Sequence, residues 1–418
     1  MKIETLYKIY KNNPNICTDT RKITDGGIFF ALRGEKFNGN KFAEEAINDG
    51  CSFAVIDEKL NTDNENILLV DNVLETLQDL ARYHRKQLSI PIIGITGTNG
   101  KTTSKELIHC ILKSEINCYA TIGNLNNHIG VPLSILEINN KHEIAIIEMG
   151  ANHKNEIAFL CDIAKPTHGV ITNVGAAHLE GFKNIQGVID TKNELFNFIK
   201  ENDGTVFVNS KDKLLLNLSK EIHRFTYGEK GSSKGSLIKN TPYLSIKFNN
   251  TQINSNLIGE YQFNNIMLAV CMGKQFGITD LNIKKAIESY IPQNNRCEVI
   301  QTKKNKLILD AYNANPSSMR AMIISFSKQT DANKLCILGD MLELGEHSKN
   351  EHIAILDLID TLSIETILIG KEFSKISNKA FKNRNNFELF LKSHPIKNKT
   401  ILLKGSRSIS LEKLTKYL

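Results

Sequence analysis

The chain has 418 residues, of which 41% are hydrophobic and 23% are charged. This is the composition of a globular protein, and the length exceeds what one hydrophobic core usually spans, so two or three domains are expected. The formal net charge of +7 is spread without a dense basic block, which indicates a mild preference for anions rather than a nucleic-acid-binding surface, and small anionic substrates fit this charge as well as any polymer. Eight scattered cysteines without a C-x-x-C pair indicate reduced thiols in a cytoplasmic protein.

The N-terminal residues MKIETLYKIYKNN lack an apolar core of signal-peptide length, so secretion is not expected. No apolar run approaches the roughly 20 residues that cross a bilayer, so membrane insertion is not expected either. A monomer is the default expectation for the oligomeric state.

Residues 1–88 read as a small α/β unit. Apolar runs at 29–34 and 53–57 indicate strands, residues 42–50 form a helical pattern closed by glycine, and residues 74–88 have apolar side chains at helical spacing. We therefore expect a first domain over 1–88, ending just before Pro91.

From residue 92 the pattern changes to near-continuous apolar strands that alternate with helices. Such strands are buried on both faces, which predicts a parallel sheet covered by helices. Residues 237–258 alternate like antiparallel strands, and an apolar helix ends at Gly277. A second doubly wound α/β pattern follows Pro292, so we expect a three-domain α/β protein with a central domain over 89–293 and a Rossmann-like domain over 294–418.

The strongest local signal lies between the strand at 92–96 and the helix that follows it. It is a glycine-rich loop that resembles a shortened Walker motif, with Ile95 where the full pattern has glycine. Glycines let backbone N–H groups surround phosphate oxygens, the lysine neutralises phosphate charge, and a threonine hydroxyl can bind Mg²⁺. The loop predicts nucleoside triphosphate binding by Gly97, Thr98, Asn99, Gly100, Lys101, Thr102 and Thr103.

Two further polar residues follow neighbouring strands of this expected sheet. Glu148 ends the strand EIAIIE, and His178 lies shortly after the strand HGVITN. Because the carboxyl ends of parallel strands line the ligand crevice, both are candidates for binding a divalent metal. Alternatively, Glu148 caps a helix and His178 is a hydrogen-bonded loop residue.

Lys192 lies in a helix whose apolar positions mark a buried side, where a lysine ordinarily extends its amine to solvent. Asp310, Asp340 and Lys404 stand at the ends of apolar strands in the last domain, so each is a candidate for its ligand crevice.

The chain resembles the ATP-dependent Mur ligases, and within them the branch that joins D-alanyl-D-alanine to UDP-N-acetylmuramoyl-tripeptide. The resemblance runs nearly from end to end, through the strings ALRGEKFNGNKF, GITGTNGKTTSKE, GNLNNHIGVPLS, EMGANHKNEI, NVGAAHLEGF, DAYNANPSSM, LGDMLELGEHS and KGSRS. The chain departs from the usual family residues at Gln262, His128, Leu309 and Asn193.

The resemblance implies an N-terminal domain for the uridine nucleotide, a central ATPase domain and a C-terminal Rossmann-like domain. It implies that Thr20, Arg21, Arg33 and Gly34 lie in the uridine pocket and that Asn124, Asn126 and Asn127 line the substrate site. It places Asn265, Arg296 and Asp310 at ATP. It assigns magnesium to Thr102, Glu148, His178 and Lys192, with Lys192 carbamylated by CO₂, and catalysis to Lys101, His178 and Lys192.

The implied reaction is ATP-dependent peptide ligation through an acyl phosphate in peptidoglycan synthesis, with ATP and Mg²⁺ required. The substrates are then UDP-N-acetylmuramoyl-tripeptide and D-alanyl-D-alanine. Two alternatives remain at this point. One is a ligase of the folylpolyglutamate type, which shares the loop and the lysine, and the other is a P-loop switch or nucleic-acid-stimulated ATPase. The latter requires a basic stripe with interleaved aromatics, which the sequence does not show.

Overall fold

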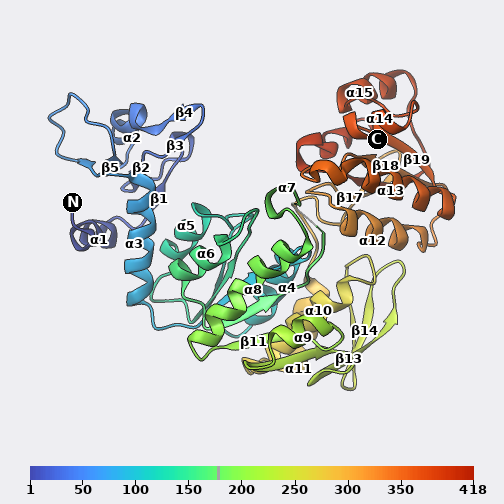
Figure 1. Cartoon of the computed structure of the whole chain (residues 1–418), viewed down its shortest axis with the longest axis horizontal. Helices are drawn as coiled ribbons and strands as arrows, with labels where there is room; N and C mark the ends of the chain where they lie inside the picture. Colours follow the sequence, from blue (N-terminus) through green and yellow to red (C-terminus); the bar gives the residue numbers. More distant parts are fainter. Residues whose placement is uncertain (177–178) are drawn as a thin grey trace.

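The computed structural model describes residues 1–176 and 179–418, and it confirms the expected α/β fold. Three principal sheets follow one another along the chain. The N-terminal and C-terminal parts lie at opposite ends of the molecule, with the largest sheet and its helices between them (Figure 1). None of the helices in the described residues is long and apolar enough to cross a bilayer. All eight cysteines are free, as expected.

The N-terminal part is a four-stranded parallel sheet in the order β1-β2-β5-β6, with a small hairpin formed by β3 and β4. The helix α3 begins where the Asn72 side chain accepts a hydrogen bond from the Glu75 backbone N–H at 3.0 Å. The elements are α1 (Ile3–Asn12), β1 (Ile16–Cys17), β2 (Ile28–Phe30), β3 (Arg33–Gly34), β4 (Phe37–Asn38), α2 (Ala43–Asn48), β5 (Phe53–Ile56), β6 (Ile67–Leu69) and α3 (Val73–Gln87).

The central part is a nine-stranded sheet in the order β15-β14-β13-β12-β11-β10-β7-β9-β8. Its strands are β7 (Ile92–Thr96), β8 (Cys118–Ala120), β9 (Ile144–Glu148), β10 (His168–Ile171), β11 (Thr205–Asn209), β12 (His223–Gly228), β13 (Ser233–Lys239), β14 (Ser245–Phe248) and β15 (Thr251–Asn254). Its helices are α4 (Lys101–Leu112), α5 (Gly130–Leu136), α6 (Glu156–Ala164), α7 (Leu179–Phe182), α8 (Ile185–Glu201), α9 (Lys213–Leu218), α10 (Gln262–Gln275) and α11 (Asp280–Ser289).

Strands β8 to β13 pair in parallel, whereas β13, β14 and β15 pair antiparallel, as the alternation at 237–258 predicted. Every residue of β7 and β9 is buried because helices cover both faces. Alternate side chains enter two different cores: Ile92 packs with residues of α5, α6 and α8, and Ile93 packs with residues of α4 and α10.

The C-terminal part is a five-stranded sheet in the order β16-β17-β20-β18-β19. It is parallel except for β16, an antiparallel edge strand that the sequence pattern did not reveal. The elements are β16 (Glu298–Gln301), β17 (Lys306–Asp310), α12 (Pro316–Ser327), β18 (Lys334–Gly339), α13 (Ser348–Leu362), β19 (Glu365–Ile369), α14 (Lys371–Ile376), α15 (Arg384–Ser393) and β20 (Thr400–Lys404).

Asp340 has a structural role in this part. Its carboxylate is buried and accepts hydrogen bonds from the backbone N–H groups of Glu372 at 2.9 Å and Phe373 at 3.0 Å, at the start of α14. The expectation that Asp340 faces the ligand crevice is therefore wrong, because its oxygens are used to cap a helix.

We expect Asp340→Ala to lower the free energy of unfolding by about 1–3 kcal/mol, since two buried N–H groups lose their acceptor. Urea unfolding measures the change. Asp357→Ala, at an exposed position of α13 in the same sheet unit, is the matched control. Equal stability of the two variants would contradict the capping role.

Candidate functional site

The loop between β7 and α4 has the backbone of a phosphate-binding turn. Gly97 has φ +143° and Gly100 has φ +79°, values that favour glycine. A Cβ at Gly97 would lie 2.0 Å from Thr172 Oγ1. Thr172 Oγ1 donates to the Asn99 carbonyl at 2.6 Å, so the end of β10 holds the loop in place.

Lys101 is the first residue of α4, and its ammonium is directed back over the loop. Nζ donates to the carbonyl of Gly97 at 2.7 Å and to that of Thr98 at 3.3 Å. Burial lowers the pKa of Lys101, and the charge of Glu148 partly offsets this effect. The ammonium is thus held where a phosphate group on the loop can replace the carbonyls as its partner.

The loop lies at one end of a cavity of about 1200 Å³. The cavity is lined by residues that follow β7, β9, β10 and β11 and by residues of α10, and its opposite wall comes from the C-terminal part. All seven residues predicted for the phosphate loop line it, as do Glu148, Lys192, Asn265, Arg296 and Asp310. The carboxyl ends of the parallel strands therefore meet at a single site, as expected for an open α/β sheet.

The two carboxylate oxygens of Glu148 differ in their contacts within the described residues, since only one of them accepts a hydrogen bond. Oε1 accepts a hydrogen bond from Asn126 Nδ2 at 2.8 Å. Oε2 is buried and has no hydrogen-bond partner among residues 1–176 and 179–418. Glu148 Oε2 and the buried Thr102 hydroxyl, which both belong to residues that line the cavity, are oxygen ligands of the kind that Mg²⁺ prefers, and Mg²⁺ takes only one or two carboxylates from a protein.

Within the described residues there is no cluster of three or more His, Cys, Asp and Glu that could hold a metal ion by itself. This is compatible with an ion held mainly by substrate phosphates and water. His178, the other residue predicted for metal binding and catalysis, lies outside the described residues.

Lys192 does not reach solvent, contrary to the behaviour of an ordinary helix-surface lysine. The residue is 3% exposed on α8, and its side chain lines the cavity. Burial, reinforced by the positive charge of Lys101, lowers the pKa of Lys192 to about 7. Its amine therefore loses its proton near neutral pH.

The C-terminal wall contacts the phosphate loop directly. Asn99 Nδ2 donates to Ser317 Oγ at 2.8 Å, and Asn315 Nδ2 donates to Asn99 Oδ1 at 2.9 Å. Asn315 also caps α12, so these contacts join the loop to the first turn of that helix. They link parts of the chain more than 200 residues apart, and the sequence motifs did not assign them a partner.

Three charged side chains on this wall are also held in place. The guanidinium of Arg296 lies over the ring of Tyr312, 3.6 Å from its centroid. Asp310 Oδ2 accepts from Lys404 Nζ at 2.6 Å, so both strand-end residues reach the cavity as an ion pair.

At the α10 side of the cavity, Asn265 is fixed by its neighbours. Its Nδ2 donates to Gln262 Oε1 at 2.6 Å, and its Oδ1 accepts from Ser104 Oγ at 3.2 Å. It lies so close to Gly100 that a Cβ there would be 2.7 Å from Asn265 Oδ1. Asn265 and the phosphate loop therefore form one packed unit.

The asparagines after β8 lie differently from one another. Asn126 and Asn127 line the cavity, whereas Asn124 is exposed and outside it. Asn127 Oδ1 accepts from the backbone N–H groups of Ile129 and Gly130 at the start of α5. Asn126 is thus the member whose side chain reaches Glu148.

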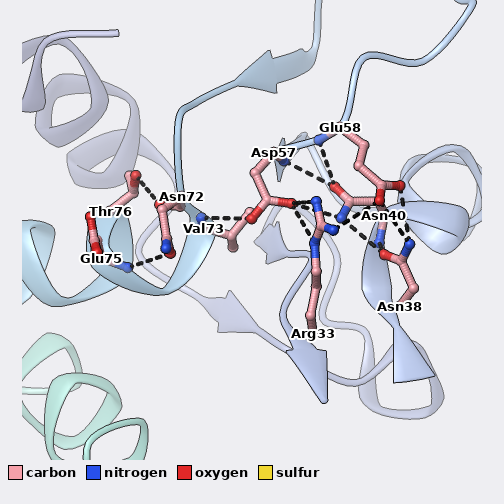
Figure 2. A network of polar contacts seen from close by, with 9 residues as sticks. All are labelled: Arg33, Asn38, Asn40, Asp57, Glu58, Asn72, Val73, Glu75 and Thr76. Atoms are coloured by element: carbon pink, nitrogen blue, oxygen red, sulfur yellow. Dashed lines mark hydrogen bonds and ion pairs between the residues drawn. The ribbon is translucent and has the colours of Figure 1, made fainter. Parts of the chain in front are cut away.

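A second, smaller cavity lies in the N-terminal part and is lined by Arg33, Gly34, Phe37, Lys41 and neighbouring residues. Figure 2 shows the network behind it. Arg33 pairs with Asp57 at 2.6 Å and Glu58 at 2.9 Å, and the buried Asn40 side chain donates to Asp57 and accepts from its backbone. Asp57 also accepts from the Val73 N–H, which ties this network to the start of α3 (Figure 2).

The other residues predicted for the uridine pocket lie elsewhere. Thr20 and Arg21 form a 3-10 turn and do not line the smaller cavity, and Arg21 pairs with Asp19 at an exposed position. Of the four residues predicted for the uridine pocket, Arg33 and Gly34 line the smaller cavity and Thr20 and Arg21 do not.

The phosphate loop, the cationic cavity at the strand ends and the three consecutive α/β units define a nucleoside-triphosphate-binding protein of several domains. Family models match the chain over residues 14–85 (Mur ligase family, catalytic domain), 95–273 (Mur ligase middle domain) and 295–407 (Mur ligase, glutamate ligase domain). The chain belongs to the Mur ligase family.

Individual relatives and structures agree with this assignment. The chain is 32% identical to the UDP-N-acetylmuramoyl-tripeptide--D-alanyl-D-alanine ligase of Bacillus subtilis, with 96% of this chain and 92% of the relative covered. The crystal structure of MurF from Acinetobacter baumannii has a TM-score of 0.87 and 27% identity, with 99% and 98% covered. MurF from Thermotoga maritima, in complex with ADP, has a TM-score of 0.84 and 27% identity, with 97% of each chain covered.

We expect Gly100→Ala to weaken binding of a non-hydrolysable ATP analogue at least about tenfold, because the new Cβ meets Asn265 and the backbone is held at positive φ. Isothermal titration calorimetry measures the affinity. Gly277→Ala is the matched control, since Gly277 has φ +82° with no atom near its Cβ position. Wild-type affinity in Gly100→Ala would show that the loop does not hold the nucleotide.

Proposed function

We propose that this protein joins D-alanyl-D-alanine to the terminal carboxylate of UDP-N-acetylmuramoyl-tripeptide with hydrolysis of ATP to ADP and phosphate. The observation that carries the proposal is the large cavity, in which the phosphate loop, Lys101, Lys192 and Glu148 face Arg296 and Asp310 across two parts of the chain. The names of the relatives, which match over nearly the whole length, support the particular substrates.

The chain's own residues would bind and orient the ATP phosphates. Backbone N–H groups of the loop and the start of α4 point at the phosphates, and Lys101 exchanges its carbonyl partners for phosphate oxygens. Thr102 and Glu148, with the predicted ligand His178, would hold Mg²⁺, which neutralises phosphate charge and polarises the transferred group.

The acceptor carboxylate would then attack the γ-phosphorus and form an acyl phosphate with release of ADP. The amine of the dipeptide attacks the acyl carbon, and phosphate leaves from the tetrahedral intermediate. Positioning and charge stabilisation account for most of the rate in such transfers. The cavity meets both needs, because its walls carry the phosphate loop that positions ATP and several cationic side chains.

The remaining predicted residues have roles in binding. Arg33 and Gly34, at the smaller cavity, are proposed to hold the uridine nucleotide, while Asn126 and Asn127 line the path of the tripeptide. Asn265 is proposed for adenine, and Arg296 with Asp310 for ATP from the C-terminal side. Thr20, Arg21 and Asn124 do not line either cavity in this structure, so their proposed roles in substrate binding rest on the family resemblance alone.

The product is a UDP-muramoyl-pentapeptide precursor of peptidoglycan, so the activity supports cell-wall growth, cell shape and division. Because ATP and a UDP-linked substrate are consumed, we propose a cytoplasmic location. A monomer suffices for the proposed site, since one chain supplies both walls of the cavity.

A folylpolyglutamate type of ligase is the alternative within the same fold. Its solved structures resemble this chain with TM-scores of 0.59 and 0.61 at 13% and 14% identity, which speaks for the fold alone. The relatives named as D-alanyl-D-alanine ligases favour the dipeptide over glutamate as the substrate. The first of them is 32% identical to this chain, about twice the identity of the folylpolyglutamate structures.

We expect phosphate release from ATP to require both the UDP-linked tripeptide and D-alanyl-D-alanine, because the reaction needs a carboxylate acceptor and then an amine. A phosphate-release assay with each substrate omitted in turn measures this, and glutamate replaces the dipeptide as the competing amine.

Lys101→Ala should lower turnover by about two to four orders of magnitude. Rapid ATP hydrolysis with neither substrate present would overturn the proposal.

We also propose that Lys192 is carbamylated by CO₂ and then binds metal as a carboxylate. Carbamylation needs the neutral amine, and the lowered pKa of about 7 supplies it at neutral pH. The free ammonium would instead repel Mg²⁺.

We expect ¹³C-bicarbonate to give a protein-bound carbamate signal in NMR that weakens as the pH falls below about 7, because protonation of the amine blocks the reaction. Lys192→Ala should lack the signal and be nearly inactive, with partial rescue by short-chain carboxylates. Lys200→Ala, at an exposed position of the same helix, is the control. Full activity of Lys192→Ala would refute the role.

A further inference from the structure

Lys105 is a buried lysine that the proposed mechanism does not use. It lies one turn after Lys101 on α4, and its side chain is 3% exposed. Of the described residues near it, Lys101, Asn126 and Glu148 line the large cavity, whereas Lys105 does not. The ammonium is therefore behind the wall of the site, where a buried charge is retained only if other groups compensate it.

The partners of Lys105 come from the loop after β8. Nζ donates to the carbonyl of Thr121 at 2.6 Å and to that of Gly123 at 3.2 Å. These carbonyls belong to the segment that leads to the asparagines of the substrate side, at residues 124–127. Lys105 thus fastens the beginning of this loop to the helix that starts at the phosphate loop.

The same ammonium faces the carboxylate at the end of β9. Nζ lies 3.8 Å from Glu148 Oε2, the oxygen without a hydrogen-bond partner in the described residues. Glu148 Oε1 accepts from Asn126 Nδ2, and the Asn126 carbonyl accepts from the Gly150 N–H at 2.7 Å. The loop is consequently held at its start by Lys105 and at Asn126 by the β9 end.

These contacts form a closed arrangement. The Glu148 backbone N–H donates to Thr121 Oγ1 at 3.0 Å, so the two loop anchors and the carboxylate are also joined to each other. An ammonium has three N–H donors, which suits two carbonyls and a carboxylate in different directions. An apolar side chain of similar length satisfies none of them.

We propose that Lys105 is a positioning residue that fixes residues 121–127 relative to the phosphate loop. It keeps the acceptor substrate aligned with the γ-phosphate of ATP through a single helix, α4, which carries Lys101 to the nucleotide and Lys105 to the acceptor side. The inference rests on the proposed function, because it presumes that the acceptor lies along residues 124–127.

Lys105→Met tests the proposal, because it keeps an unbranched side chain and removes the charge and the donors. We expect KM for the UDP-linked tripeptide to rise at least about tenfold while affinity for a non-hydrolysable ATP analogue changes by less than about threefold. Lys113→Met, at an exposed position that follows the same helix, is the matched control. If Lys105 had only a structural role, Lys105→Met would have a lower melting temperature, and tripeptide and ATP-analogue binding would weaken to a similar extent.

Hydrogen exchange provides a second measurement that needs no substrate. Peptides that cover residues 121–127 should exchange about tenfold faster in Lys105→Met than in the wild type, with little change in the C-terminal part. Hydrogen exchange tests the anchoring of residues 121–127 directly and does not depend on ligase activity. A wild type without ligase activity would therefore refute the proposed function and leave the anchoring role of Lys105 intact.

Lys105→Arg serves if the methionine variant does not fold. Arginine retains the charge, but its planar guanidinium does not match the positions of the two carbonyls. We therefore expect a smaller rise in KM for the UDP-linked tripeptide, again with little change in affinity for the ATP analogue. Unchanged exchange in residues 121–127, or an equal loss of tripeptide and ATP-analogue binding, would overturn the proposal.

Discussion

The site depends on an imbalance of charge at the carboxyl ends of β7 and β9. Lys101 and Lys105 lie near the buried carboxylate of Glu148, and Lys192 is close enough to Lys101 for the two charges to repel each other. Such a group of partly desolvated cations is unfavourable by itself, and burial lowers the pKa of each lysine. Anionic phosphates and a carboxylate substrate offset the repulsion among these lysines. Because the lysines are already in place, this attraction stabilises both the bound substrates and the transition state.

The second wall of the cavity makes the site a property of the whole chain. The first turn of α12 reaches the phosphate loop through Asn315 and Ser317, and Arg296 is held flat against Tyr312. These groups can contact a nucleotide only while the C-terminal part is apposed to the central sheet. The site is therefore complete only in an arrangement in which these two parts are in contact, as they are in this structure.

The secondary structure and the phosphate loop could be predicted from the sequence, because both depend on local patterns. Continuous apolar runs identified the parallel strands, and the glycines with Lys101 identified the loop. Asp340 was misplaced because a strand-end carboxylate can face the crevice or cap the next helix, and the choice depends on Gly370 and α14, which come 30 residues later. The edge strand β16 was missed because it has only four residues, EVIQ, too few for a clear pattern, and its place in the sheet depends on pairing with β17.

The sequence by itself determined the fold class, the nucleotide-binding loop and the family resemblance, since these rest on residue order and local spacing. Only the tertiary structure decided the environment of each charged group. Lys192 is buried near Lys101, and its pKa is lowered to about 7. Lys105 lies behind the cavity wall and donates to the carbonyls of Thr121 and Gly123. Asn124 lies outside the cavity, whereas Asn126 lines it and donates to Glu148. Burial and the distances between charges are set by segments far apart in the chain, so no local pattern could specify them.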